Sequence, residues 1–325
     1  MAKIVFNNKN YNIDESALAP AMATLEAHLR SMAGGADPEP DVNGVAGLYQ
    51  TGAIALYEEQ GADAIEGMMI KSWEDLVANG TVHVEDGVVY SNFDNNTWAN
   101  ASSAVLVGDL ILPNDGSITK LGDYHYWFDE NNVYSDEGRI AFGNCTKLTG
   151  IIIPDSVIST GEYALMQCYR ITYVNIPDNV TSIGAYTFSD CSGLTNITIP
   201  NNVTSIGDNA FNNCSGLTNI TIPSSVTDIG SNVFMSCSNL TNIVISNSIT
   251  SIEMGMFYNC SSLTNITIPD SITSIGSGAF KGCTNLTDIT FEGTIEQWNA
   301  ITFENNWNLN VPATYVQCSD GQVAL

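Results

Sequence analysis

The sequence predicts an α+β protein whose main part is a solenoid, a stack of short units that share one residue pattern. Seven of the eight cysteines recur every 23 residues, at Cys145, Cys168, Cys191, Cys214, Cys237, Cys260 and Cys283. A phenylalanine or leucine precedes each of them by three residues, and a short β-branched run such as Ile220–Ile222 follows. A unit this small cannot bury its own apolar face, so it is stable only against neighbouring units.

The unit around Cys214 shows how the pattern predicts local structure. Its run Ile220-Thr221-Ile222 alternates apolar and polar β-branched residues, which is typical of a strand. Pro223 lacks the N–H that a strand ladder needs, and Gly207 favours a sharp turn before the phenylalanine. Strands of successive units, stacked about 4.8 Å apart, bring equivalent residues into columns. The pattern therefore predicts parallel strands with one internal column of cysteines.

The cysteine column lies in an apolar context, which favours reduced thiols that pack in the core. Stacked disulfides between adjacent units are the alternative, where the geometry suits them. No Cys-x-x-Cys pair occurs, which argues against a zinc site. Cys318 is outside the 23-residue register and is a candidate free thiol.

Residues Val203–Pro223 read Val-Thr-Ser-Ile-Gly-x-x-Ala-Phe-x-x-Cys-x-x-Leu-Thr-x-Ile-x-Ile-Pro. This pattern resembles the leucine-rich repeats of the BspA-like class, and the resemblance covers about half of the chain. It implies a leucine-rich-repeat solenoid with parallel strands. Proteins of that class are mostly surface adhesins and host-interaction proteins of anaerobic bacteria, with relatives in protists and phages. The resemblance therefore implies a role in surface binding.

The composition argues against several classes of function. The formal net charge is -26, with only nine Lys or Arg residues and none between Arg170 and Lys281, so a phosphate backbone would be repelled along the repeats. The three histidines, His28, His83 and His125, stand apart from any nucleophile motif and from one another. We therefore predict a protein that is not an enzyme, with no catalytic residue, no metal site, no cofactor and no nucleic-acid partner.

Residues 1–36 are predicted to form an N-terminal attachment module. Residues 3–13 alternate as a small hairpin, and a helix with an apolar seam follows, at Leu18, Met22, Leu25, Leu29 and Met32. The seam either packs on the hairpin or joins a second copy in a homo-oligomer. The module resembles short N-terminal modules of gut phage structural proteins, which implies that it attaches to other phage structural proteins.

Residues 37–47 form an acidic, proline-spaced linker, and residues 48–100 a small adaptor. In the adaptor, Ser72 begins a short helix that ends near Gly80, and Asp86-Gly87 predicts a tight hairpin. The N-terminus has no apolar run long enough for a signal peptide, and no segment reaches the roughly 18 residues of a membrane span. We therefore expect assembly in a cytoplasm and no membrane insertion.

Residues 101–140 are predicted to be an N-terminal cap that contains an insertion of about sixteen residues, Asp123–Gly138. This loop combines five aromatic and five acidic residues and interrupts the repeats. Insertions in repeat proteins often carry binding sites, and aromatic rings beside polar groups suit sugar or protein contact. The candidate ligand-binding residues are Tyr124, Tyr126, Trp127 and Tyr134. The alternative is that these rings plug the open end of the solenoid.

Residues 141–291 hold the leucine-rich repeats, and residues 292–325 are predicted to be a C-terminal cap. Thr294 and Gln297 have the spacing of a capping box at a helix N-terminus. Trp298, Phe303 and Trp307 are expected to cover the last coil. These three rings therefore receive a structural role.

Three functions are compatible with these observations. The first is a non-enzymatic virion structural or adhesion protein that displays the array on a virion surface and binds a host surface protein or glycan. The second is a BspA-like adhesin on a bacterial cell surface. The third is a glycan-active enzyme, which would need two carboxylates roughly 5 to 9.5 Å apart on the strand face. The outward strand positions are threonine and asparagine, apart from Val244 and the single acidic residue Asp288, so the first two are favoured.

Overall fold

The computed structural model describes two compact units, Met1–Asp75 and Leu76–Leu325. Side chains are described for residues 76–78, 80–91, 110, 112, 116–122 and 140–325. The backbone alone is described for residues 2–6, 9–13, 73–75, 93–94, 99–100, 108–109, 111, 127–128 and 134–135. Within these residues, the only helices are two six-residue segments, α4 (Trp73–Ala78) and α5 (Ile295–Ala300). Neither is long enough to cross a membrane.

The first unit contains an antiparallel hairpin of β1 (Ala2–Phe6) and β2 (Lys9–Ile13). Ile4 pairs with Tyr11, as the alternating pattern of residues 3–13 predicted. The predicted helix of residues 18–32 and the linker of residues 37–47 lie outside the described residues.

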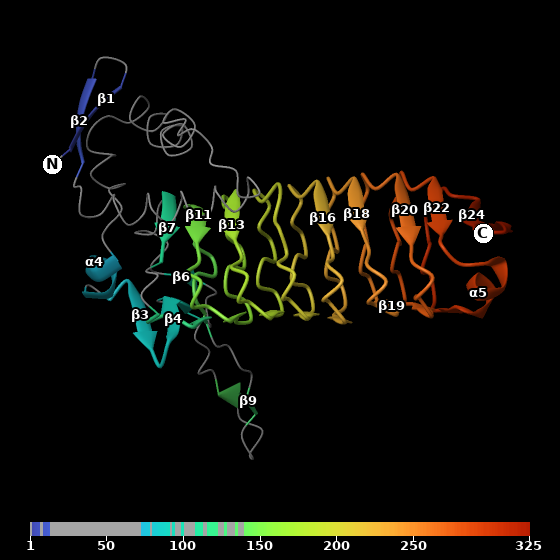
Figure 1. Ribbon diagram of the computed structural model, residues 1–325, viewed down its shortest axis with the longest axis horizontal. Coiled ribbons are helices and arrows are strands. Elements are labelled where there is room, and N and C mark those ends of the chain that lie inside the picture. Colours follow the sequence, from blue (N-terminus) through green and yellow to red (C-terminus); the bar gives the residue numbers. More distant parts are fainter. Residues whose placement is uncertain are drawn as a thin grey trace. The chain divides into compact units, whose positions relative to one another are not determined.

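One row of parallel strands runs along the second unit, at the upper edge of Figure 1. This long-strand row consists of β7 (Gly108–Ile111), β11 (Leu148–Ile152), β13 (Tyr173–Asn175), β16 (Asn219–Thr221), β18 (Asn242–Val244), β20 (Asn265–Ile268), β22 (Asp288–Phe291) and β24 (Tyr315–Cys318). An isolated bridge joins Asn196 to Asn219 between β13 and β16. From β11 to β22 the paired residues are 23 apart, as in Asn219 and Asn242. β25 (Gly321–Ala324) pairs antiparallel with β24 and ends the row.

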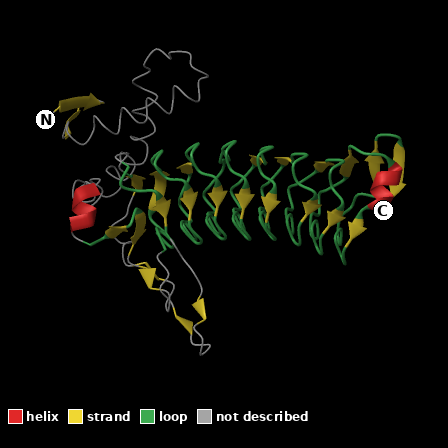
Figure 2. Cartoon of the chain, turned by 60° about the horizontal axis from the view of Figure 1, so that its bottom comes forward, coloured by secondary structure: helices red, strands yellow, loops and turns green. Residues whose placement is uncertain are grey.

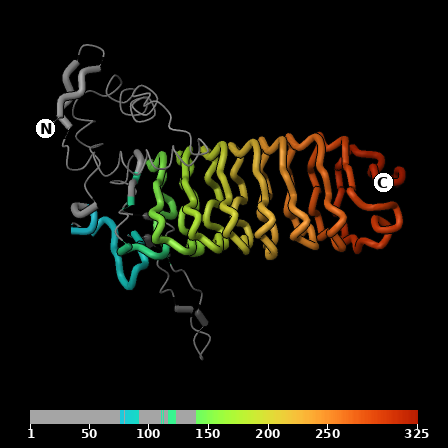
Figure 3. The backbone as a smooth tube through the Cα atoms, viewed as in Figure 1, coloured from blue at the N-terminus to red at the C-terminus, as the bar shows by residue number. Residues whose placement is uncertain are grey.

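A second row of two-residue parallel strands follows the opposite edge of each coil (Figures 1 and 2). This short-strand row consists of β8 (Lys120–Leu121), β12 (Ser159–Thr160), β14 (Ser182–Ile183), β15 (Ser205–Ile206), β17 (Asp228–Ile229), β19 (Ser251–Ile252), β21 (Ser274–Ile275) and β23 (Thr302–Phe303). The stacked coils that the two rows delimit are seen most directly in Figure 3. The 23-residue solenoid with parallel strands is therefore confirmed.

A hairpin of β3 (Val82–Glu85) and β4 (Val88–Ser91) extends the short-strand row at its N-terminal end. β4 pairs parallel with β8, so Val89 lies beside Leu121. The turn residues Asp86 and Gly87 both have positive φ, 51° and 78°, as a type I′ turn requires. The hairpin predicted from Asp86-Gly87 is confirmed. Two further pairs of short strands are antiparallel, β5 (Phe93–Asp94) with β6 (Ala99–Asn100) and β9 (Trp127–Phe128) with β10 (Tyr134–Ser135).

The strand register measures the insertion independently of the sequence pattern. Thr160 pairs with Ile183 at a separation of 23 residues, whereas Leu121 pairs with Thr160 at a separation of 39. The difference of 16 residues equals the insertion expected from the sequence. These extra residues follow β8 in the chain.

The third side of each coil, called the turn side, consists of turns that also bond to the next coil. Phe211 N–H donates to the Val233 carbonyl at 3.0 Å, and Asn213 N–H to the Met235 carbonyl at 2.7 Å. Two residues per coil, such as Asn209 and Asn213, have positive φ, a conformation that Asn tolerates well. The sequence did not predict this ladder. It supplies hydrogen-bond partners to backbone groups on this side of the coils.

Glycine recurs before the phenylalanine because neighbouring coils approach closely there, and not because of the turn itself. The expected turn follows directly, over residues 208–213, but Gly207 itself is outside the positive-φ residues, so the turn does not require glycine there. A Cβ on Gly207 would lie only 2.5 Å from the Ala185 nitrogen of the preceding coil. Gly184, Gly230 and Gly276 are equally close to neighbouring backbone, so this column sets the close approach of coils.

The core contains a stack of rings beside a column of thiols. Five phenylalanines stack with centroids 5.2 to 5.9 Å apart, namely Phe188, Phe211, Phe234, Phe257 and Phe280. The described cysteines are all free and buried, which confirms the prediction of reduced packing thiols and includes Cys318. Each thiol from Cys168 to Cys283 donates to a carbonyl of the preceding coil, as Cys214 Sγ does to Phe188 O at 3.0 Å.

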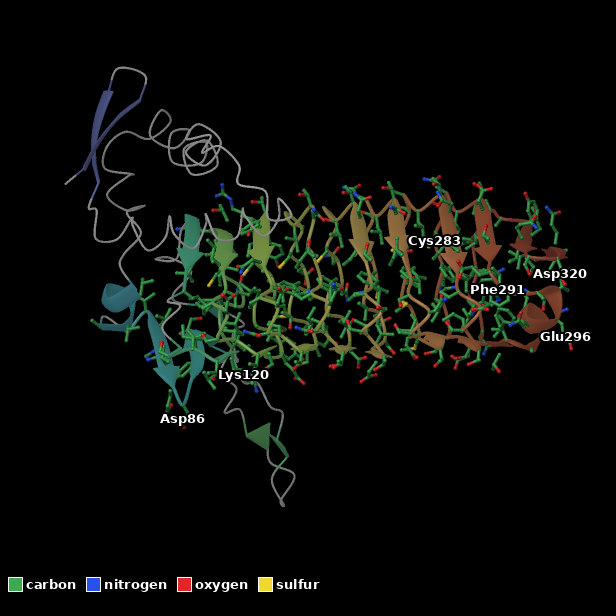
Figure 4. The ribbon with its side chains drawn as sticks, viewed as in Figure 1. Asp86, Lys120, Cys283, Phe291, Glu296 and Asp320 are labelled. Atoms are coloured by element: carbon green, nitrogen blue, oxygen red, sulfur yellow. The ribbon has the colours of Figure 1, made fainter. Side chains whose placement is uncertain are left out.

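The C-terminal end is closed by α5 and by three aromatic rings. Thr294 is the N-cap, and its side chain and that of Gln297 form the predicted capping box. Trp298 packs within 5.1 to 6.1 Å, centroid to centroid, of Phe291, Phe303 and Trp307. Trp307 also meets Phe280 edge-on, so it continues the phenylalanine stack. Figure 4 labels Phe291 in the array and Glu296 and Asp320 at this end. The predicted structural role of these rings is confirmed.

Candidate functional site

The outward face of the long-strand row presents two columns of polar side chains. Strand residues alternate between the core and solvent, as in exposed Asn219, buried Ile220 and exposed Thr221. The first column, called the amide column, is Tyr173, Asn196, Asn219, Asn242, Asn265, Asp288 and Tyr315. The second, called the hydroxyl column, is Asn175, Thr198, Thr221, Val244, Thr267, Thr290 and Gln317.

A threonine ladder beside the amide column holds its side chains in place. Thr218 Oγ1 donates to the Thr195 carbonyl at 3.3 Å, and Thr241 Oγ1 donates to the Thr218 carbonyl at 3.1 Å. Asn219 Nδ2 in turn donates to Thr218 Oγ1 at 2.9 Å. Within the described residues the Asn219 Oδ1 atom accepts no hydrogen bond, so it faces solvent as an acceptor. Asn265 makes the same contact with Thr264, at 3.1 Å.

The two columns are uncharged except at Asp288, whose carboxylate accepts a hydrogen bond from Thr287. The same groups return about every 4.8 Å, the spacing of adjacent strands. A surface of this kind offers repeated neutral donors and acceptors. It lacks the paired carboxylates that glycoside hydrolysis requires.

The cysteines are the most reactive residue type in the array, and burial suppresses their chemistry. Desolvation raises the pKa of the Cys168, Cys237 and Cys283 thiols to about 12, and raises those of Cys191, Cys214 and Cys260 well above the ordinary value. The nucleophilic thiolate is therefore scarce at neutral pH. Among the described residues, no group of three or more His, Cys, Asp or Glu side chains could hold a metal ion.

The N-terminal coils of the array differ from the others in their exposed side chains. Four exposed residues on two successive coils are called the basic aromatic patch: Lys147, Tyr169, Arg170 and Tyr173. Tyr169 and Tyr173 are 42% and 39% exposed, which is unusual for rings in a regular array. Partial burial raises the pKa of both phenols, and Asp190 adds to the effect at Tyr169, so both hydroxyls are protonated donors at neutral pH.

The sequence interpretation missed this patch, although a signal was present. Tyr169 stands where the next coils have Ser192 and Ser215, and Arg170 where they have Gly193 and Gly216. A search for departures from the repeat at exposed positions would have found it.

The predicted ligand-binding residues belong to the insertion. Tyr124 and Tyr126 lie outside the described residues. Trp127 and Tyr134 lie in β9 and β10, which pair antiparallel with Ser135 opposite Trp127 and Tyr134 opposite Phe128. The side chains of both strands lie outside the described part of the chain, so their role as a binding site stays a prediction.

Comparison with known families identifies the class of protein that this fold and surface define. The family described as BspA type Leucine rich repeat region, with six copies, matches residues 138–241 and 182–310, more than half of the chain. The protein belongs to this family of BspA-type leucine-rich repeat proteins.

The chain is similar to two solved structures, and the first of them shows the same fold. The T. pallidum leucine-rich repeat protein TpLRR is 21% identical, with 65% of this chain and 90% of that chain covered and a TM-score of 0.51. A leucine-rich repeat protein from Bacteroides ovatus ATCC 8483 is 23% identical, with 73% and 74% covered and a TM-score of 0.42. Comparison with curated proteins finds no match.

Proposed function

We propose that this protein is a non-enzymatic adhesion protein whose long-strand row binds a host or surface glycan. The observation that carries the proposal is the pair of outward amide and hydroxyl columns, which are uncharged except at Asp288. Sugar hydroxyls both donate and accept hydrogen bonds, and asparagine and threonine side chains also have both donor and acceptor groups. Because the same groups recur at each coil, the surface suits a polymer with its own repeat.

Two features support binding rather than catalysis. The array has a single acidic residue, Asp288, in its outward columns, and its thiols are buried with raised pKa values. Binding through a repeated surface needs neither a nucleophile nor a general acid. A glycan-active enzyme is the competing function, and turnover of a host polysaccharide by the full chain would favour it.

Adding charge to the amide column tests the proposal. Asn219→Asp combined with Asn242→Asp keeps the side-chain size, and Asp288 shows that the column accommodates a carboxylate. We expect the double variant to lose at least 10-fold in affinity for host cells or their purified surface glycans, because donors are replaced by acceptor-only groups. The matched control is Ser182→Asp combined with Ser205→Asp on the short-strand row, where Asp228 occurs naturally. Equal loss in both variants, or in neither, would count against the long-strand row.

We further propose that residues 1–36 attach the protein to a virion, with phage structural proteins as partners, and that the array faces outward. The resemblance of this module to gut phage proteins supports the proposal. A bacterial cell surface is the alternative location, and the family to which the chain belongs is compatible with it. Deletion of residues 1–36 should abolish incorporation into particles and leave a folded array. Retained incorporation would contradict the attachment role.

The insertion is proposed as an additional contact. Its rings at Tyr124, Tyr126, Trp127 and Tyr134 combine large contact area with polar tips. Changing Tyr126 and Trp127 to alanine should weaken binding to host cells while the melting temperature falls by no more than a few degrees. A variant that unfolds, with unchanged binding per folded molecule, would instead identify the rings as an end plug.

A further inference from the structure

The basic aromatic patch places two cations on neighbouring coils. Lys147 and Arg170 are 23 residues apart, so they occupy the same column one coil apart, about 4.8 Å between strands. Both are exposed, and within the described residues neither has an ion pair or a side-chain hydrogen bond. The next cation along the array, Lys281, lies over the Tyr258 ring, 5.3 Å from its centroid. The patch therefore holds two cations on adjacent coils in a protein of net charge -26.

The column continues from Arg170 with glycine, so the next coil places no side chain beside the cations. Gly193 follows Arg170, and a Cβ there would lie 2.8 Å from the Tyr169 carbonyl oxygen, so the coils approach closely without a side chain between them. In the amide column, Tyr173 pairs with Gly150 on one side. The Tyr173 ring thus borders a position that has no side chain.

The amide column leads directly away from the patch. Tyr173 is its first member, and four asparagines and then Asp288 follow over five coils, a span of about 24 Å. The first half of this path is uncharged, and its far end is acidic. A ligand with negative charge along its whole length would be repelled at Asp288 and by the net charge of the chain.

We propose that the basic aromatic patch binds the carboxylate of one acidic sugar at the end of an otherwise neutral glycan, whose chain then follows the amide column. This inference rests on the proposed function and adds the ligand class and the direction of binding. Arg170 can hold a carboxylate through two parallel N–H donors, and Lys147 adds a point charge. The faces of Tyr169 and Tyr173 provide apolar area for a sugar ring, and their protonated hydroxyls donate hydrogen bonds.

Other anionic polymers fit less well. A nucleic acid needs several cations to neutralise its phosphates, and the patch offers two. An acidic peptide would meet the same two cations but would gain little from the row of amides and hydroxyls beyond Tyr173. A glycan uses both parts of the surface.

The test compares one pair of oligosaccharides on the full-length protein: lacto-N-neotetraose and its sialylated form, which differ by one terminal acidic sugar. Calorimetry should show at least about 10-fold tighter binding of the sialylated form at low salt, since a hydrogen bond to a charged group is worth roughly that factor. The advantage should shrink as salt rises, because the patch is exposed. Arg170→Gln should remove it and leave the affinity for the neutral form within twofold.

Variants that restore the repeat sequence allow effects on binding to be separated from effects on folding. Tyr169→Ser and Tyr173→Asn introduce the residues found at these positions in the next coil, Ser192 and Asn196, and each should weaken both glycans severalfold. The control is Lys281→Gln, which removes one positive charge at a distance and should change neither affinity.

Equal binding of both glycans by the wild-type protein would overturn the inference and leave the proposed function standing. Binding of neither glycan would overturn the inference and count against the proposed function too. A poly-glutamate peptide that competes as effectively as the sialylated glycan does would show that the patch recognises negative charge alone. That result would also overturn the inference.

Discussion

The central coils and the C-terminal cap bury their apolar groups by different means. In the centre, Phe234 lies between Phe211 and Phe257, and Cys237 donates to the Phe211 carbonyl of the coil before it. At the cap there is no further coil, and Trp298, Phe303 and Trp307 take its place around α5. Identical neighbours stabilise the centre, whereas residues that occur once stabilise the end.

The two regions should therefore respond differently to the loss of a buried side chain. A central residue belongs to a chain of contacts that extends through several coils, so its loss affects the cooperative unit as a whole. A cap residue contacts only the last coil, so its loss should open the end and leave the centre closed.

Phe234→Ala should have the largest effect. Removing a fully buried ring from the middle of the stack leaves a cavity and should cost about 3–5 kcal/mol of unfolding free energy. The measurement is urea denaturation of the full chain, with the exposed change Val244→Thr as the control that should be nearly neutral. A loss below about 1 kcal/mol would show that the stack is not a cooperative element.

Trp298→Ala should cost about 3 kcal/mol, and the loss should be confined to the end of the array. Trp298 is buried against Phe291, Phe303 and Trp307, all of which belong to the last coil and the cap. Hydrogen exchange should show lost protection in β22 and β24, with β16 and β18 unchanged. Uniform loss of protection along the array would contradict a separable end.

The thiol column should limit the stability of the centre at high pH. Burial raises the pKa of the Cys237 thiol from 9.0 to about 12. Because folding favours the neutral thiol, Cys237 contributes to the free energy of unfolding. This contribution is fully present below pH 9, the ordinary thiol pKa, and is lost as the pH rises toward 12. Between pH 8 and 10 the Cys237→Ala variant should therefore lose less stability than the wild-type protein, by roughly 1.4 kcal/mol. Parallel pH profiles would argue against a buried neutral thiol.

Thiol labelling checks the same column without a substitution. At pH 8 the native protein should leave Cys191, Cys214 and Cys237 unmodified, because these thiols are buried and protonated. Denaturation should expose all of them to the reagent. Rapid labelling of the native protein would contradict the placement of the thiols inside the coils.

Thr294→Ala should have the smallest effect, about 1 kcal/mol, because it removes one half of the capping box of α5. The measurement is the thermal unfolding midpoint, compared with Thr302→Ala, an exposed threonine in β23 outside the box. Equal effects of the two changes would mean that the cap contributes nothing specific.

Much of the fold was predictable because burial repeats at a fixed spacing. Cys214 and Cys237 share a core environment, so the same residue type returns after 23 positions, and the hairpin at Asp86-Gly87 and the capping box at Thr294 follow from local chemistry. The candidate site was less predictable. Tyr169 and Arg170 are exposed, and no burial constraint makes an exposed position repeat, so their departure from the repeat does not by itself distinguish a binding site from neutral variation.

The period and the identity of the core columns follow from the sequence alone, because apolar residues must alternate with polar ones wherever a strand is half buried. Which distant residues become neighbours on the surface depends on the tertiary structure. Lys147 and Arg170 form one patch because the coils stack in register, and Cys214 bonds to Phe188 because the preceding coil presents that carbonyl. Such contacts depend on the geometry of two coils together, which no single repeat contains.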